Sequence, residues 1–191
     1  MYKQCPTEKG AAQQQILEKT LLSMMGEIPY DAISVRSLCT EANISRKSFY
    51  RLFANKEDVL FALIDHTYLN YAHYLPDCSL IHDGANRELQ TFFLYWREQK
   101  ALLDALKACQ KSGLLVLRSL EHVLHDDSDT LRLLGAADNH YSREITLFFV
   151  SGIMTLIVDW HEAGYDRSAT EMAELMQLLL TQPPMRIPIP L

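Results

Sequence analysis

The sequence is poor in the residues that mark fibrous, disulfide-bonded and membrane-spanning proteins. Its 191 residues include seven glycines, seven prolines and four cysteines, fewer than collagen-like or disulfide-rich chains contain. The longest stretch without a charged side chain spans residues 145–158, which is shorter than the roughly 20 residues needed to cross a bilayer. With 48% hydrophobic residues and a net charge of -6, the chain can bury a core. We therefore expect a globular protein of one or two domains.

The cysteines and the first residues indicate a reducing compartment. Residues 1–10 contain Lys3, Glu8 and Lys9 and no apolar stretch, which argues against a secretory signal. We therefore expect the protein to remain in the cytoplasm. The cysteines lie far apart and form no CxxC pair, so reduced thiols are expected. They are Cys5, Cys39, Cys78 and Cys109.

Apolar residues recur at helical spacing along nearly the whole chain, and no segment alternates as a β-strand does. The pattern predicts an all-α protein of about nine helices. The first spans 12–25 and ends at Gly26, with Pro29 close behind. Ser168 and Glu171 have the capping-box spacing at the start of the last helix. The other predicted helices are 34–42, 45–52, 55–74, 86–98, 100–111, 113–125, 139–164 and 168–181.

Residues 34–53 have the features of a helix-turn-helix, in which two short helices cross closely. Cys39 is a small residue where the helices would cross. Asn43 is in the predicted turn, and asparagine tolerates the left-handed backbone conformation better than most residues. The segment therefore meets the steric demands of the motif. Its inward-facing apolar residues are Leu38, Ile44, Phe49 and Leu52.

This segment is also the basic part of an acidic protein. Residues 32–56 contain five basic residues and one acidic residue, whereas residues 57–191 contain 10 basic and 19 acidic residues. Such an asymmetry favours a polyanionic partner for the basic segment alone. Chance clustering on a solvated surface is the alternative explanation of the charge pattern.

The predicted second helix of the motif presents residue types that bind DNA. Arginine and lysine can donate to guanine or phosphate, and serine or tyrosine hydroxyls can bond to phosphate. Helix N-termini add free amides that attract phosphate. We predict DNA contacts from Ser34, Ser45, Arg46, Lys47, Ser48, Tyr50, Arg51 and Lys56.

Further positions between residues 12 and 60 combine into a recognisable pattern, namely Gly26, Tyr30, Ser34, Val35, Ala42, Asn43, Ile44, Ser45, Ser48, Tyr50, Phe53, Lys56, Glu57 and Leu60. With this spacing the segment resembles the DNA-binding domain of the tetracycline-repressor (TetR) family. The resemblance implies that residues 48, 50 and 56 touch DNA, and that residues 46, 47 and 51 tune sequence preference. It also implies C-terminal helices that bind a small effector and form a homodimer.

Three residues depart from the usual family pattern. Cys39 stands where alanine is usual, Asn43 where glycine is usual and Lys47 where glycine is common. Asn43 can occupy the turn at modest cost, and Lys47 adds helix propensity and charge. The assignment is therefore kept, but Lys47 prevents the operator from being predicted by analogy.

Aromatic residues line one face of the predicted helices 55–74 and 86–98. Such a stripe is more often part of a hydrophobic core than a binding site. The alternative is a pocket for an apolar or aromatic effector, consistent with the usual character of small-molecule sites. The predicted pocket residues are Tyr68, Tyr71, Phe93 and Trp96.

The last two predicted helices are the candidates for a dimer interface. Segment 145–160 is apolar on most sides, so we expect it to be buried on all sides. Two such helices could pair with the same two of a second subunit as a four-helix bundle. The alternative is that both pack within one subunit. The predicted interface residues are Phe149, Gly152, Leu156, Met172, Leu175, Met176 and Leu179.

Together with the resemblance to the TetR family, these patterns imply three regions: a DNA-binding domain at 10–55, an effector-binding and dimerisation domain at 56–182, and a proline-rich tail at 183–191. The resemblance implies a sequence-specific transcriptional regulator, most often a repressor in that family, that a small molecule releases from a pseudo-palindromic operator.

Two other classes of function are compatible with the sequence. One is a helical adaptor whose basic segment binds an acidic protein. The other is an enzyme, for which Asp65, His66, Asp159 and His161 could supply acids and bases. No nucleophile elbow, P-loop or HExxH motif accompanies these residues. We expect no enzymatic activity and no cofactor. We also expect no metal site, although His122 and His125 are one helical turn apart.

Overall fold

The computed structural model describes residues 7–74, 85–125 and 140–181, and within them it contains nine α-helices, one 3-10 turn and no strand. The predicted all-α class is therefore confirmed. The elements are α1 (Glu8–Glu27), η1 (Tyr30–Ala32), α2 (Val35–Glu41), α3 (Arg46–Leu52), α4 (Lys56–Tyr74), α5 (Ala85–Glu98), α6 (Lys100–Ala108), α7 (Gly113–His125), α9 (Ser142–Glu162) and α10 (Ala169–Thr181).

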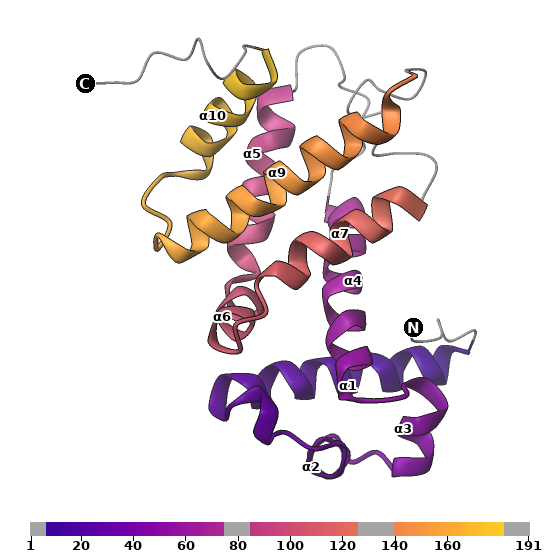
Figure 1. The fold of residues 1–191 in the computed structure, drawn as a ribbon. Helices are drawn as coiled ribbons and strands as arrows, with labels where there is room; N and C mark the ends of the chain where they lie inside the picture. The colour runs from indigo at the N-terminus through magenta and orange to yellow at the C-terminus, as the bar shows by residue number, and fades with distance from the viewer. Residues whose placement is uncertain (1–6, 75–84, 126–139, 182–191) are drawn as a thin grey trace.

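The helices form two groups joined by α4 (Figure 1). We call α1 to α3 the head and α5 to α10 the body. Within the head, α1 packs against α2, and α2 packs against α3. Within the body, α10 packs on α5, and α7 packs on α9. One cluster of buried apolar residues runs from Leu17 in the head to Met176 in the body, so the two groups share a continuous core.

The helix ends follow local sequence signals. Thr7 caps α1, since its side chain accepts a hydrogen bond from the Gly10 N–H at 3.2 Å. The first helix therefore begins before the predicted residue 12. The predicted capping box of α10 is confirmed, because Ser168 and Glu171 exchange hydrogen bonds. The predicted tail at 183–191 lies outside the described residues, as do Cys5 and Cys78, and the predicted domain boundary at residue 55 stays a prediction.

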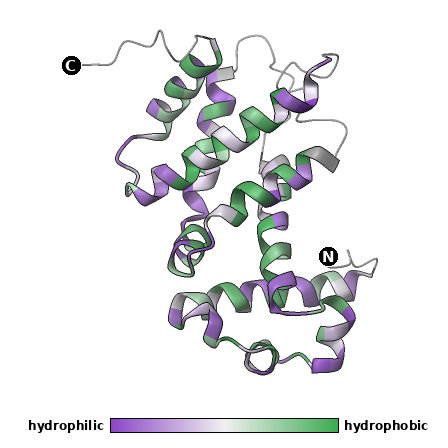
Figure 2. Ribbon diagram, viewed as in Figure 1, coloured by the Kyte–Doolittle hydropathy of each residue, from purple (hydrophilic) through white to green (hydrophobic). Residues whose placement is uncertain are grey.

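Helix α9 differs from the prediction in its exposure. Its buried side contains Val150, Met154 and Ile157, but its opposite side is open and leaves Phe148 70% exposed. The expectation of burial on every side is therefore wrong for a single chain. Figure 2 shows hydrophobic residues along the middle of α9. In the described part of the chain, α9 is the one helix whose length and composition would also suit a membrane span, and a third of its most apolar window is buried.

Two of the residues predicted at the dimer interface lie in the core of one subunit. Met172 and Met176 are 3% and 5% exposed, because α10 turns this face toward α5. Their predicted interface role is corrected accordingly. The predicted residues Leu175 and Leu179 are half-buried on α10, Phe149 and Leu156 are half-buried on α9, and Gly152 is exposed.

Two of the predicted pocket residues are likewise core residues. Phe93 and Trp96 have no exposed surface, so no space large enough for water reaches either ring. Phe93 packs edge to face on Trp160 with 5.6 Å between ring centroids. Trp96 packs on Phe92 and Tyr95, so both predicted pocket residues are core residues in the structure. Tyr68 and Tyr71 remain half-buried.

Consecutive residues of α4 pair with helices on two sides. Asp65 is 1% exposed and accepts hydrogen bonds from the Arg118 guanidinium of α7, one of them 2.8 Å from Nε to Oδ1. Nε2 of His122 lies 3.1 Å from the same Oδ1. Burial works to raise the pKa of Asp65, but the contacts with His122 and Arg118 outweigh it and hold that pKa below its ordinary value.

The next residue points to the head. Nδ1 of His66 lies 2.9 Å from Oε1 of Glu18, a residue of α1 that is 4% exposed. The hydrogen bond to Glu18 raises the pKa of His66, although burial opposes this change. Asp65 and His66 therefore fasten α4 to the body and to the head, respectively.

The His66–Glu18 pair predicts a pH-dependent stability. Because the folded-state pKa of His66 is raised, the stabilisation is complete below the ordinary histidine pKa and is lost as the pH rises through the folded-state value. We expect His66→Gln to lower the free energy of unfolding more at pH 5.5 than at pH 8.5, by about 1 kcal/mol. Urea unfolding at the two pH values measures this difference. His140→Gln, at an exposed histidine before α9, is the control, and an equal loss at both pH values in His66→Gln would contradict the assignment.

Candidate nucleic-acid interface

The turn between α2 and α3 is a Schellman-type helix end. The Ile44 N–H donates to the Cys39 carbonyl at 2.9 Å, and the Asn43 N–H donates to the Thr40 carbonyl at 3.1 Å. Asn43 has a φ of 51°, which is the left-handed conformation that this helix end requires. The predicted role of Asn43 in the turn is therefore confirmed.

Buried apolar residues fix α3 against the rest of the head. Leu38 and Phe49 have no exposed surface, and Cys39, Ile44 and Leu52 are also buried. Cys39, the small residue predicted where the two helices cross, is 4% exposed. Phe49 and Leu52 occupy the inner face of α3, so Arg46, Lys47, Tyr50 and Arg51 are exposed to solvent.

Two of the serines predicted to contact DNA, Ser34 and Ser45, cap helices in the structure. The Ser34 hydroxyl accepts a hydrogen bond from the Ser37 N–H at 3.0 Å, and the Ser45 hydroxyl accepts one from the Ser48 N–H at 3.1 Å. Ser34 and Ser45 remain exposed and Ser48 is half-buried. Each hydroxyl oxygen has two lone pairs, so capping leaves capacity for a further contact.

The outward face of α3 presents the predicted cationic residues together. Arg46, Lys47, Tyr50 and Arg51 are all exposed. The Arg46 guanidinium carbon lies 5.8 Å from the centre of the Tyr50 ring, and Arg51 Nη2 donates to Oε1 of Gln13 on α1 at 3.4 Å. The arrangement places donors for bases and phosphates on one side of a short, rigid helix.

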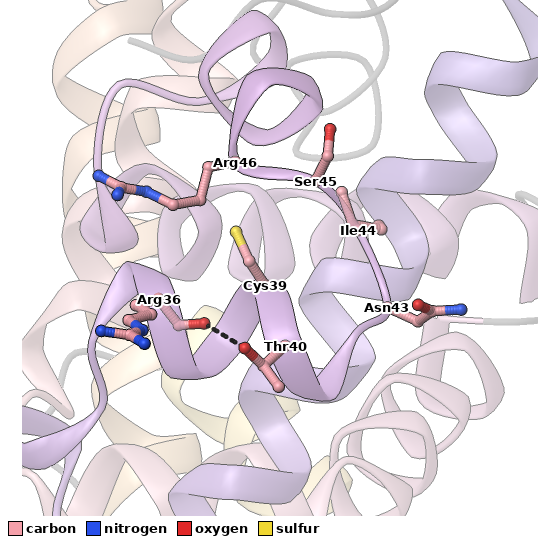
Figure 3. Close-up of a pocket in the computed structure, with 7 residues that line it drawn as sticks. All are labelled: Arg36, Cys39, Thr40, Asn43, Ile44, Ser45 and Arg46. Carbon is pink, nitrogen blue, oxygen red and sulfur yellow. Dashed lines mark hydrogen bonds between the residues drawn. The ribbon is translucent and has the colours of Figure 1, made fainter.

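A hollow of about 650 Å³ lies between α2 and the start of α3 (Figure 3). Arg36 and Arg46 line it, and in Figure 3 their guanidinium groups lie toward the same side. Arg36 is not among the DNA contacts predicted from the sequence. Its charge and its position two residues after the Ser34 cap were the signals that could have found it. The remaining lining residues are Cys39, Thr40, Asn43, Ile44 and Ser45.

Lys56, at the start of α4, already has a partner in the head. Its Nζ donates to the Tyr30 carbonyl of η1 at 2.6 Å and lies 4.0 Å from the centre of the Tyr30 ring. Burial lowers the pKa of Lys56. The Asn55 side chain caps this helix by accepting from the Asp58 N–H at 2.9 Å. The structure therefore holds Lys56 at the edge of the head.

Of the four residues that could supply acids and bases to an enzyme, Asp65, His66 and His161 each contact an oppositely charged or acidic partner, and Asp159 lies apart on the surface. Asp65 binds Arg118, His66 binds Glu18, and His161 Nε2 lies 2.8 Å from Oδ1 of Asp104. Asp159 is exposed on α9. Across residues 7–74, 85–125 and 140–181, no group of three or more histidine, cysteine or acidic residues could hold a metal ion.

Comparison with known proteins identifies the fold and the type of the N-terminal domain. The structure is similar to the crystal structure of Lin0861 from Listeria innocua, with a TM-score of 0.72 and 16% sequence identity over 93% of this chain and 94% of that chain. This likeness concerns the fold. Residues 19–63 match the family model of bacterial regulatory proteins of the tetR family, and they span the helix-turn-helix and the first part of α4. Residues 19–63 therefore form a DNA-binding domain of the tetR type, and this domain supports a DNA-binding transcriptional regulator.

Proposed function

We propose that α3 binds in the major groove and selects the operator through Arg46, Lys47 and Arg51. The observation that supports this most strongly is the exposed cationic face of α3 on a well-packed helix-turn-helix. Arginine can bond to the O6 and N7 atoms of guanine, and lysine can contact a base or a phosphate. Arg36 extends the same surface across the hollow between α2 and α3.

The polar residues at the helix starts then position the head on the DNA backbone. Ser34, Ser45 and Ser48 lie at the N-terminal ends of α2 and α3, where hydroxyl and amide groups suit phosphate oxygens. The exposed Tyr50 hydroxyl suits a phosphate in the same way. Lys56 is the proposed phosphate contact at the start of α4, held by Tyr30.

A homodimer would present two heads to the two halves of a pseudo-palindrome. We propose that the outer stripe of α9, defined by Ile145, Phe148, Phe149, Gly152 and Leu156, forms the centre of the interface. Phe148 is the most exposed large apolar side chain of this stripe. An apolar face of this kind is stabilised by burial against a copy of itself. Leu175 and Leu179 of α10 are candidates for its margin.

We further propose that the regulator is a repressor and that a small effector releases it from DNA. The supporting feature is α4, because Asp65 ties it to α7 and His66 ties it to α1. An effector bound beside Tyr68 and Tyr71 on α4 would act on the head through this helix. Release requires that the effector bind the DNA-free arrangement more tightly than the DNA-bound one.

Operator selection by α3 is tested by replacing Arg46. We expect Arg46→Ala to cost about 1 to 3 kcal/mol of binding free energy and to relax the preference at one position of each half-site. The measurement is selection of bound duplexes from a random pool, followed by affinities for the selected and scrambled sequences. Arg97→Ala removes an exposed arginine of α5 and is the matched control. If the native protein prefers no duplex over random competitor, the proposal fails and an acidic protein partner becomes the better explanation.

The interface is tested at Gly152. A Cβ added to Gly152 meets no atom within 4 Å in the single chain, so Gly152→Asp should fold. At a dimer interface the carboxylate would be buried without a partner, which is strongly unfavourable. We expect the variant to sediment as a monomer. Gly113→Asp, at another exposed helical glycine with open space, should leave the native state of assembly unchanged. A Gly152→Asp dimer would exclude the outer stripe of α9 as the interface.

A further inference from the structure

The ring of Tyr30 is contacted by two lysines from different parts of the chain. Tyr30 belongs to η1 in the head and is 7% exposed. The Nζ of Lys56, at the start of α4, lies 4.0 Å from the ring centre, and the Nζ of Lys111 lies 5.5 Å from it. Both ammonium groups are within the distance at which an aromatic ring attracts a cation. Tyr30 therefore connects η1, the start of α4 and the body.

Lys111 is the member of this cluster that comes from the body. It follows the end of α6, where Gln110 has a φ of 57° and the Lys111 N–H donates to the Leu106 carbonyl at 2.8 Å. The Gln110 N–H also donates to the Lys107 carbonyl at 3.0 Å. These two bonds make a Schellman helix end. The backbone of Lys111 is thus fixed by α6.

Its side chain reaches the first turn of α4 as well as Tyr30. The Nζ of Lys111 lies 3.4 Å from Oε1 of Glu57. Glu57 directly follows Lys56 in the sequence. Lys111 therefore contacts both the Tyr30 ring, on which Lys56 also packs, and the residue next to Lys56. Burial lowers the pKa of Lys56, and the Lys111 charge adds to this effect, whereas the Asp31 and Glu57 carboxylates act to raise that pKa. The cluster thus contains two carboxylates as well as two ammonium groups.

We infer that Lys111 is a positioning residue for DNA binding. From the turn between α6 and α7 it holds Tyr30 and Glu57, and through them it fixes the start of α4 with Lys56 beside the helix-turn-helix. The inference rests on the proposed operator binding and deepens it, since it assigns control of affinity to a residue of the body that does not touch DNA. Any shift of α6 against the head would change the placement of Lys56.

The test is the salt dependence of DNA binding by Lys111→Met, which keeps most of the apolar stem and removes the charge. We expect affinity for the selected operator to fall by about fivefold. The slope of log affinity against log salt should not change, because a residue that neutralises no phosphate releases no counterion. Lys111→Arg keeps the cation and should restore affinity. Lys107→Met, at an exposed lysine of α6, is the matched control.

A second pair of variants tests whether Tyr30 transmits the effect. Tyr30→Phe keeps the ring and should bind as the native protein does, whereas Tyr30→Leu should lose affinity as Lys111→Met does. Combining Tyr30→Leu with Lys111→Met should cost less than the sum of the single losses, because the two residues act through one contact. Thermal unfolding of each variant shows that the head remains folded.

The outcomes separate the two proposals. Unchanged affinity in Lys111→Met overturns the role of Lys111 and leaves operator binding intact. A salt slope reduced by about one shows a direct phosphate contact, which also overturns the positioning role. Fully additive losses in the double variant exclude Tyr30 as the intermediary. A native protein that binds no duplex selectively overturns operator binding, and the role of Lys111 fails with it.

Discussion

The packing of α4 against helices of both groups is the constraint on which the rest of the structure depends. Val59, Leu60 and Ile64 of α4 have no exposed surface, and α4 packs against α1 as well as α5 and α7. Since protein interiors are densely packed, a helix shared in this way cannot move against one group without disturbing its packing with the other. The head therefore has a defined orientation relative to the body rather than hanging from a flexible linker.

Polar contacts specify which faces of α4 pack against the head and the body. Asp65 and His66 are consecutive, yet one pairs with α7 and the other with α1, because successive residues of a helix point about 100° apart. Buried ion pairs contribute less to net stability than their contacts suggest, but they specify which surfaces of the helices meet. A change in the body that separates Asp65 from Arg118 would therefore alter the position of α4 and, through it, that of the head.

The division of charge between head and body is consistent with this mechanical arrangement. The basic residues of the helix-turn-helix lie on its outer surface, whereas much of the acidic charge belongs to the body. The head can thus approach a polyanion while the acidic body is repelled by it. Lys111 is a basic residue of the body that lies against the head and pairs with Glu57.

Sequence alone determined what depends on neighbouring residues. Caps at Ser34 and Ser45, the left-handed Asn43 and the small Cys39 define the helix-turn-helix, because each acts within a few residues of itself. Periodicity likewise located the helices of the body. Periodicity does not decide which apolar faces meet, so it predicts a pocket or an interface for Phe93, Trp96, Met172 and Met176, which lie in the core. Only the tertiary structure brought Glu18 to His66, Asp65 to Arg118 and Lys111 to Tyr30, because these partners are far apart in the chain and their meeting depends on the packing of whole helices.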